Sequence, residues 1–302
     1  MKVLIDIDRA LVEGHITADE RDKLKRLSRG QTSDLALNIL IAFGIVAVTA
    51  GFVALTRSYE SMYVPGCALA ALGLALVLRG GERWHLLAQI TLVVGTALFG
   101  AWMIVAHGAT PRVMIAATII FAGASVMALN GLLAAAAVLT LSSALGAATK
   151  YIHARYFLAV EAPAMTILVC GIVAVGLVAA SRRVPTRYER IALIAARTST
   201  LLVNLAFLVG SLWGDRFGGV RISRDAFSVA WAMALLAAAI WAWRENRRWP
   251  LIAATVFAAL HFYTQLFERL GPHAIAIVIA GALSIAIGYG LKLLLAAMPK
   301  PA

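Results

Sequence analysis

Residues 113–149 read VMIAATIIFAGASVMALNGLLAAAAVLTLSSALGAAT, a run of 37 residues without a charged side chain. As one straight helix this run would be about 55 Å long at 1.5 Å per residue. The hydrocarbon core of a membrane is only about 30 Å thick. Asn130-Gly131, in the middle of the run, is a strong turn signal. The stretch therefore predicts two membrane-spanning helices joined by a tight turn.

The whole chain has the same apolar character. Of its 302 residues, 62% are hydrophobic and 14% are charged, and the mean hydropathy is +0.86. A soluble domain is about 45–50% apolar and about 25% charged. These values exclude a soluble enzyme with a single core and a disordered or fibrous protein. They predict an all-α, polytopic membrane protein.

Ten segments approach the length of about 20 mostly apolar residues that a spanning helix needs. They are Leu35–Leu55, Tyr63–Leu78, Leu86–Ala106, Val113–Leu129, Leu132–Thr149, Phe157–Ala180, Ile191–Trp213, Ala226–Trp243, Pro250–Phe267 and Ala274–Ala296. We therefore expect a cytoplasmic segment over residues 1–33 and a transmembrane domain of about ten spans over residues 34–302.

The positive charges predict the orientation of these spans. With the N-terminus inside, 18 of the 27 Lys and Arg residues fall in cytoplasmic segments and 8 in external ones. This bias favours both termini in the cytoplasm and a multi-pass protein of a bacterial inner membrane. The net charge of +12 then indicates contacts with anionic lipid headgroups and no nucleic-acid partner. The arginines expected at the headgroups are Arg182, Arg183, Arg187, Arg190, Arg244, Arg247 and Arg248.

Residues 1–33 predict an amphipathic helical hairpin. Leu4, Ile7 and Leu11 recur at helical spacing. Thr17 and Glu20 fit a capping box, in which each side chain accepts a hydrogen bond from the other residue's backbone amide. The hairpin is either a docking element for a protein partner or a lid that packs on the spans or lies on the lipid surface.

Several motifs of the first half resemble a known family. They are Gly14-His15-Ile16-Thr17-Ala18-Asp19-Glu20, the glycine-rich run Gly44–Ala54, and Gly95-Thr96-Ala97-Leu98-Phe99-Gly100 closing near His107-Gly108. This order resembles an uncharacterised family of bacterial predicted membrane proteins, a domain of unknown function. The family's aromatic residue after the first span is absent, since the chain has Thr56-Arg57-Ser58-Tyr59 there. The resemblance implies no activity.

Short recurrences bear on symmetry and packing. Gly44–Val48 and Gly171–Val175 both read Gly-Ile-Val-Ala-Val, in spans that run in opposite directions. An inverted repeat of five plus five spans, as in many transporters, would give this relation. Five small apolar residues can also recur by chance in so apolar a chain. Glycines also recur seven apart, where we expect helix backbones to approach closely. These pairs are Gly44/Gly51, Gly66/Gly73 and Gly281/Gly288.

Ionisable and polar residues inside spans are the candidate site residues, because charge is costly in a membrane. Glu161 falls within the expected sixth span, where burial would make it a proton or cation site. Alternatively, it lies in the outer interface, hydrated or paired with Arg155 or Lys150. His261 and Gln265 lie one turn apart in the ninth span, and could line an outward cavity with Glu161 as a proton relay, or bond helices together. Arg197 either anchors an anionic substrate or reaches back to the headgroups.

No cofactor or metal is expected. Cys67 and Cys170 lie in apolar runs without the spacing of a disulfide framework or a CxxC site. His107, His153 and His273 share no loop and no ligand spacing.

Three functions fit these features. The first is transport of a small solute or ion. It is supported by the number of spans, the repeat and the pair Glu161/His261. The second is a scaffold, sensor or envelope assembly factor that acts through the hairpin. The third is an intramembrane enzyme on lipid or acyl substrates, which needs His261 in a polar cavity and is removed by dry packing around it.

Overall fold

The structure is a computed structural model. It describes residues 17, 20, 40, 41, 43–45, 47–56, 58–81, 84–152, 155–271 and 273–297. The chain divides into two compact units, Met1–Ala137 and Val138–Ala302, which are described separately below. The division falls inside the expected fifth span, so it does not coincide with the boundary between five and five spans.

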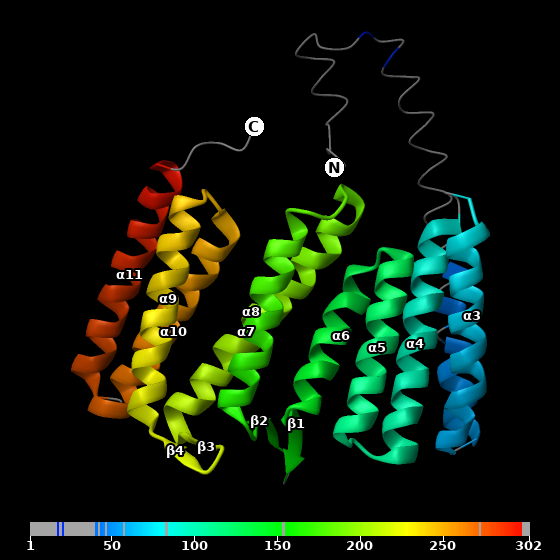
Figure 1. Ribbon diagram of the computed structural model, residues 1–302, viewed down its shortest axis with the longest axis horizontal. Helices are drawn as coiled ribbons and strands as arrows, with labels where there is room; N and C mark the ends of the chain where they lie inside the picture. The colour runs from blue at the N-terminus through cyan, green and yellow to red at the C-terminus, as the bar shows by residue number, and fades with distance from the viewer. Residues whose placement is uncertain are drawn as a thin grey trace. The chain divides into compact units, whose positions relative to one another are not determined.

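The first unit is built from helices that follow one another closely along the chain. They are η1 (Tyr59–Met62), α3 (Tyr63–Arg79), α4 (His85–His107), α5 (Pro111–Ala128) and the first part of α6 (Gly131–Ala144). An apolar helix also covers Phe43–Thr56. In this unit α3, α4 and α5 lie side by side (Figure 1). The helices α3 and α4 make the most extensive contact, and glycines on both let their backbones approach.

The turn between α5 and α6 confirms the break predicted at Asn130-Gly131. Leu129 ends α5 in the left-handed region, with φ 52°. The Asn130 Oδ1 then accepts hydrogen bonds from the amides of Leu132 (2.9 Å) and Leu133 (3.1 Å). Asn130 therefore caps the N-terminus of α6, a role worth about 0.5–2 kcal/mol.

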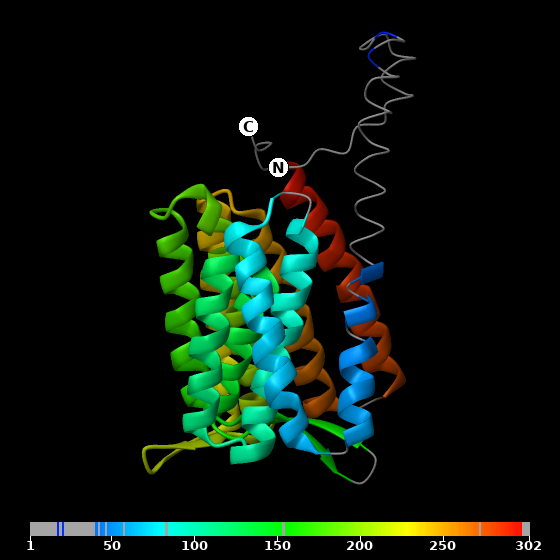
Figure 2. The ribbon, with the colours of Figure 1, turned by 90° about the vertical axis from the view of Figure 1, so that its right-hand side faces the viewer.

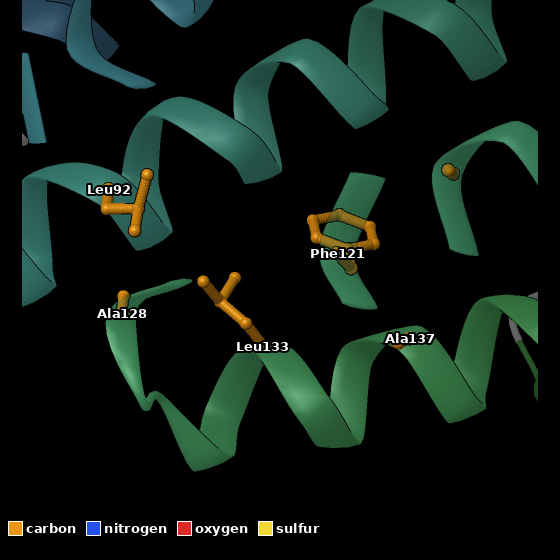
Figure 3. Packing of buried hydrophobic residues seen from close by; sticks show 6 residues of the cluster. Leu92, Phe121, Ala128, Leu133 and Ala137 are labelled. Atoms are coloured by element: carbon orange, nitrogen blue, oxygen red, sulfur yellow. The ribbon is translucent and has the colours of Figure 1, made fainter. Parts of the chain in front are cut away.

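A glutamine of α4 holds this turn from the side. The Gln89 Nε2 donates to the Ala128 carbonyl (2.6 Å), and its Oε1 accepts from the Asn130 Nδ2 (2.5 Å). The polar atoms of a turn within an apolar bundle are thereby satisfied, as burial requires. Apolar side chains of α4, α5 and α6 pack beside it (Figure 3). They are Leu92, Ala117, Phe121, Ala128, Leu133 and Ala137.

The second unit contains five further helices and two short hairpins. The elements are β1 (Ala147–Ile152), β2 (Arg155–Val160), α7 (Pro163–Ser181), α8 (Thr186–Trp213), β3 (Asp215–Phe217), β4 (Val220–Ile222), α9 (Arg224–Arg244), α10 (Arg248–Leu270) and α11 (Ala274–Ala297). The strands pair antiparallel as β1–β2 and β3–β4. Both hairpins lie at one end of the helices, and the α7–α8 and α9–α10 turns lie at the other (Figures 1 and 2).

The β1–β2 hairpin corrects the sequence prediction. The fifth span was expected to reach Thr149 and the sixth to begin at Phe157. Instead α6 ends at Ala144, and residues 147–152 pair with 155–160. An apolar run alone does not distinguish a short strand from a helix end. Pro163 stands at the first position of α7, where its missing amide costs nothing.

An aspartate of β3 stabilises the start of α7. The Asp215 Oδ2 accepts a hydrogen bond from the amide of Ala164 (2.8 Å). A carboxylate at a helix N-terminus also favours the positive end of the helix dipole. The β3–β4 hairpin is thereby fastened to α7 although the two are far apart in sequence.

The helices suit a membrane. Over the residues that the structure describes, seven helices are long and apolar enough to cross one. Three shorter apolar stretches, Phe43–Thr56, Gly131–Ala144 and Ile277–Gly290, coincide with other expected spans. Trp84, Trp213, Trp243 and Trp249 lie at helix ends, where interfacial tryptophans belong. The chain is thus an α-helical, multi-pass membrane protein, with two small β hairpins in the part of the chain that the structure describes.

Most of the expected hairpin of residues 1–33 lies outside the described residues. Thr17 and Glu20 are described, and they form the predicted capping box. The Thr17 amide donates to the Glu20 Oε2 (2.8 Å), and the Glu20 amide donates to the Thr17 Oγ1 (3.3 Å). The bond from the Thr17 amide, with that from its hydroxyl, lowers the pKa of the Glu20 carboxyl. The carboxylate therefore caps at neutral pH, and the interaction is lost as the pH falls through that lowered pKa.

Candidate functional site

A cavity of about 610 Å³ lies among α7, α8, α9 and α10 in the second unit. Pockets that hold drug-sized ligands have roughly 300–1,000 Å³. Along α7 the lining runs from Arg182 to Ala174, eight residues apart. At 1.5 Å per residue this is a depth of about 12 Å. The cavity therefore extends from the end of the helices that carries the α7–α8 turn into their apolar part.

Small side chains create this space. Alanines line it from three helices, at Ala174, Ala179, Ala238, Ala253 and Ala254. The methyl side chain of an alanine does not reach the neighbouring helix. Because larger side chains elsewhere keep the helices apart, a gap remains where alanines face one another. Near the end of the helices the large rings of Trp241 and Trp249 border the gap instead. The result is an apolar cavity with an aromatic rim.

The polar side chains within the cavity are already hydrogen-bonded. The Asn204 Oδ1 accepts from the Trp231 Nε1 (2.9 Å), and the Asn204 Nδ2 donates to the Thr200 carbonyl (2.8 Å). The Thr200 hydroxyl donates to the Ala196 carbonyl (2.8 Å). These bonds satisfy the amide and the hydroxyl within the helices. The interior of the cavity therefore offers a ligand mainly apolar contacts.

Two arginines line the cavity at the end of the helices that carries the α7–α8 turn, and this end is called the mouth below. Arg182 and Arg183 follow the last residue of α7, where a cation favours the negative end of the helix dipole. The Arg182 guanidinium binds the Glu245 carboxylate at 2.7 Å, and both side chains remain more than two-fifths exposed. Arg183 has no ion pair among the described residues and is exposed. The mouth therefore carries a net positive charge.

Arg197 borders a second, smaller cavity of about 340 Å³. This cavity shares Thr200, Trp249 and Ala253 with the first. The Arg197 guanidinium lies 5.3 Å from the centre of the Trp249 ring, a cation–π distance. The side chain thus turns toward a tryptophan at the basic end of the helices.

His261 and Gln265 lie on α10 and line neither of these two cavities. The His261 ring meets the buried Trp231 ring edge-on, with centroids 4.8 Å apart. The buried His261 Nδ1 has no hydrogen-bond partner among the described residues. At this residue the structure shows an aromatic contact, and neither of the two cavities is the polar cavity that an intramembrane enzyme would need there.

Glu161 lies outside the helices and not within a span. It precedes α7 in a bend, its side chain is exposed, and its amide donates to the Gly146 carbonyl (3.0 Å). The prediction that Glu161 is five residues deep in a span is therefore wrong, because β2 takes up the residues before it. Of the four candidates, only Arg197 borders either cavity.

Sequence reasoning missed the residues that do form the main cavity. Arg182 and Arg183 were assigned to lipid headgroups, and the alanines counted only as span residues. The available signal was an arginine pair directly after an apolar helix, combined with alanine-rich stretches in the expected eighth and ninth spans. Which helices face one another was needed to bring these together. A comparison with protein-family models, curated proteins and solved structures found no match.

Proposed function

We propose that the chain is a ten-span protein of a bacterial inner membrane, with both termini in the cytoplasm, that transports a small solute through the cavity among α7–α10. The observation that supports this most is the cavity itself, which has the volume of a ligand site and reaches about 12 Å into the helices. Substrate sites of transporters lie between helices within the membrane.

The charge pattern of the second unit supports the proposed orientation. The segments 182–190 and 244–248, at the end with the cavity mouth, carry seven arginines and two glutamates. By the bias of Lys and Arg toward the cytoplasm, this end faces inside. The cavity then opens toward the cytoplasm, the side from which an exported solute would enter.

The cavity favours transport over catalysis. Among the described residues, its lining contains no His, Cys, Asp or Glu side chain that could act as a nucleophile or a general base. The scaffold hypothesis rests on residues 1–33, most of which lie outside the described residues. It predicts that deleting residues 1–30 abolishes capture of a partner protein and leaves solute flux unchanged.

Filling the cavity tests the proposal. We expect Ala238→Trp, which places a large ring in the cavity, to reduce flux at least about tenfold in reconstituted liposomes. The measurement is uptake of a panel of radiolabelled sugars, amino acids and organic acids, with protein-free liposomes as the baseline.

The adjacent Ala237→Trp is the matched control. It makes the same change on the same helix at an exposed position, so it should transport like the wild type. If no solute of the panel moves faster than in protein-free liposomes, or if both variants transport equally, the α7–α10 cavity is not a transport site.

A further inference from the structure

The main cavity has an apolar interior and a positively charged mouth, and each would bind a different part of one ligand. Its interior is apolar over the alanine, valine and leucine side chains of α7, α9 and α10. Its mouth carries Arg182 and Arg183, both within the lining. Because an apolar wall attracts an apolar body and guanidinium groups attract carboxylate or phosphate, the two features together select a molecule with both parts.

Resting on the transport proposal, we infer that this cavity binds a single-chain amphiphilic anion, with its apolar body among α7–α10 and its anionic head at Arg182 and Arg183. A fatty acid has this chemistry. The volume of about 610 Å³ is that of a pocket for one drug-sized ligand. A two-chain phospholipid is the less favoured occupant, since a single cavity holds the apolar body.

Other ligand classes use only part of the site. A neutral apolar solute gains nothing from the two arginines. A polar anion, such as a small phosphorylated metabolite, finds few partners in the interior, because the Asn204 and Thr200 side chains are already hydrogen-bonded within the protein. Only an amphiphile uses the mouth and the interior together.

The ion pair at the mouth makes Glu245 a competitor of the ligand head. The Glu245 carboxylate lies 2.7 Å from the Arg182 guanidinium, and the pair is partly exposed. An anionic head that approaches Arg182 has to share this guanidinium with Glu245. The five N–H donors of an arginine allow such sharing or exchange. Removing the Glu245 charge should therefore strengthen binding of an anion, whereas a purely structural ion pair would predict no gain.

The test is binding of cis-parinaric acid, a fluorescent single-chain carboxylate, to the full chain in phosphatidylcholine nanodiscs. Energy transfer from tryptophan reports occupancy, because Trp241 and Trp249 border the cavity. We expect saturable binding that palmitate displaces and hexadecanol, which has the same chain without the charge, displaces at least about tenfold less well. Equal displacement by the alcohol would overturn the role of the mouth.

Three variants localise the head group. Arg182→Gln with Arg183→Gln should weaken parinarate binding at least about tenfold, and Glu245→Gln should strengthen it about threefold. Arg187→Gln with Arg190→Gln is the control, since it removes two arginines from the same end of the helices outside the cavity lining. Equal weakening by both double variants would indicate general surface charge and overturn the assignment.

Two outcomes distinguish this inference from binding of a phospholipid and from the transport proposal. If phosphatidylglycerol in the nanodisc displaces parinarate completely, the occupant is a phospholipid and the single-chain assignment is wrong. If parinarate binds as expected but neither the acid nor any solute of the panel crosses faster than in protein-free liposomes, the inference stands and the transport proposal fails. If the protein transports another solute but does not bind parinarate, the transport proposal stands and the inference about the amphiphilic anion fails.

Discussion

Replacing Gly95 by valine is expected to destabilise the first unit by about 3 kcal/mol, at the upper end of the cost of overpacking. A Cβ at Gly95 would collide with the backbone of the facing helix, at the Ala70 nitrogen and at the Leu69 carbonyl carbon (2.6 Å). A side chain could rotate away from such a contact, but backbone cannot. The helices α3 and α4 would therefore have to separate along their length.

Glycines of α3 meet α4 in the same way. A Cβ at Gly66 would lie 2.9 Å from the Phe99 nitrogen, and one at Gly73 would collide with the Leu92 backbone. Close approach of helix backbones is a main source of stability within a membrane, where lipid provides no hydrophobic drive between helices. Losing this approach removes the dispersion contacts along the interface, which explains the size of the expected effect.

Gly123→Val is the matched control for Gly95→Val. Gly123 lies within α5, and a Cβ there meets no atom within 4 Å. The measurement is thermal unfolding in detergent followed by circular dichroism, with the free energy from denaturant titration at one temperature. Equal stability of the Gly95 and Gly123 variants would show that α3 and α4 do not approach as the structure has them.

Replacing Trp231 by alanine is expected to have the largest effect on the second unit. The ring is fully buried, lies parallel to Phe207 with centroids 6.4 Å apart, and meets His261 edge-on. Tryptophan-to-alanine changes in cores cost about 3–5 kcal/mol. We expect about 3 kcal/mol, because lipid around the unfolded helices is itself apolar and the cavity is the main loss.

The substitution also affects the candidate site. Without the Trp231 Nε1, the Asn204 Oδ1 loses its 2.9 Å hydrogen bond at the inner part of the main cavity. Trp231→Phe keeps most of the volume and removes this bond, so it should cost about 1–2 kcal/mol. Trp213→Ala is the control, since 72% of that side chain is exposed, and it should change stability by at most about 0.5 kcal/mol. A loss as small for Trp231→Ala would contradict the packing described.

The sequence predicted much of the helical framework. The turn at Asn130-Gly131 was predictable because two helices there fit the membrane and one does not, and the structure closes it with the Asn130 cap. The close approach at Gly66 and Gly73 was predictable from their spacing. The same spacing was misleading at Gly44, Gly51, Gly281 and Gly288, because spacing does not say whether another helix faces the glycine. At these positions a Cβ meets no atom of the described residues within 4 Å.

The candidate site was less predictable, for a physical reason. The sequence identifies candidate ionisable residues by how deep they lie within an expected span. This depth depends on the residue at which the helix begins. Glu161 was misplaced because β2 replaces the expected start of a span. The cavity arises because alanines of three helices face one another and their small side chains leave the space between the helices unfilled. Such a gap exists only after the helices pack.

We propose above that the chain spans a membrane with the α7–α10 cavity open to the cytoplasm. The most direct test of this proposal places single cysteines in a chain with Cys67→Ala and Cys170→Ala. One is Ala179→Cys, at the cavity mouth, and the other is Val220→Cys, an exposed residue of β4 at the opposite end of the helices.

A membrane-impermeant thiol reagent is then applied to sealed vesicles of each orientation, and labelling is measured by gel shift. We expect Ala179→Cys to be labelled only in inside-out vesicles and Val220→Cys only in right-side-out vesicles. Palmitate should slow labelling of Ala179→Cys and leave Val220→Cys unchanged. Labelling of both cysteines from one side, or the reverse pattern, would contradict the account.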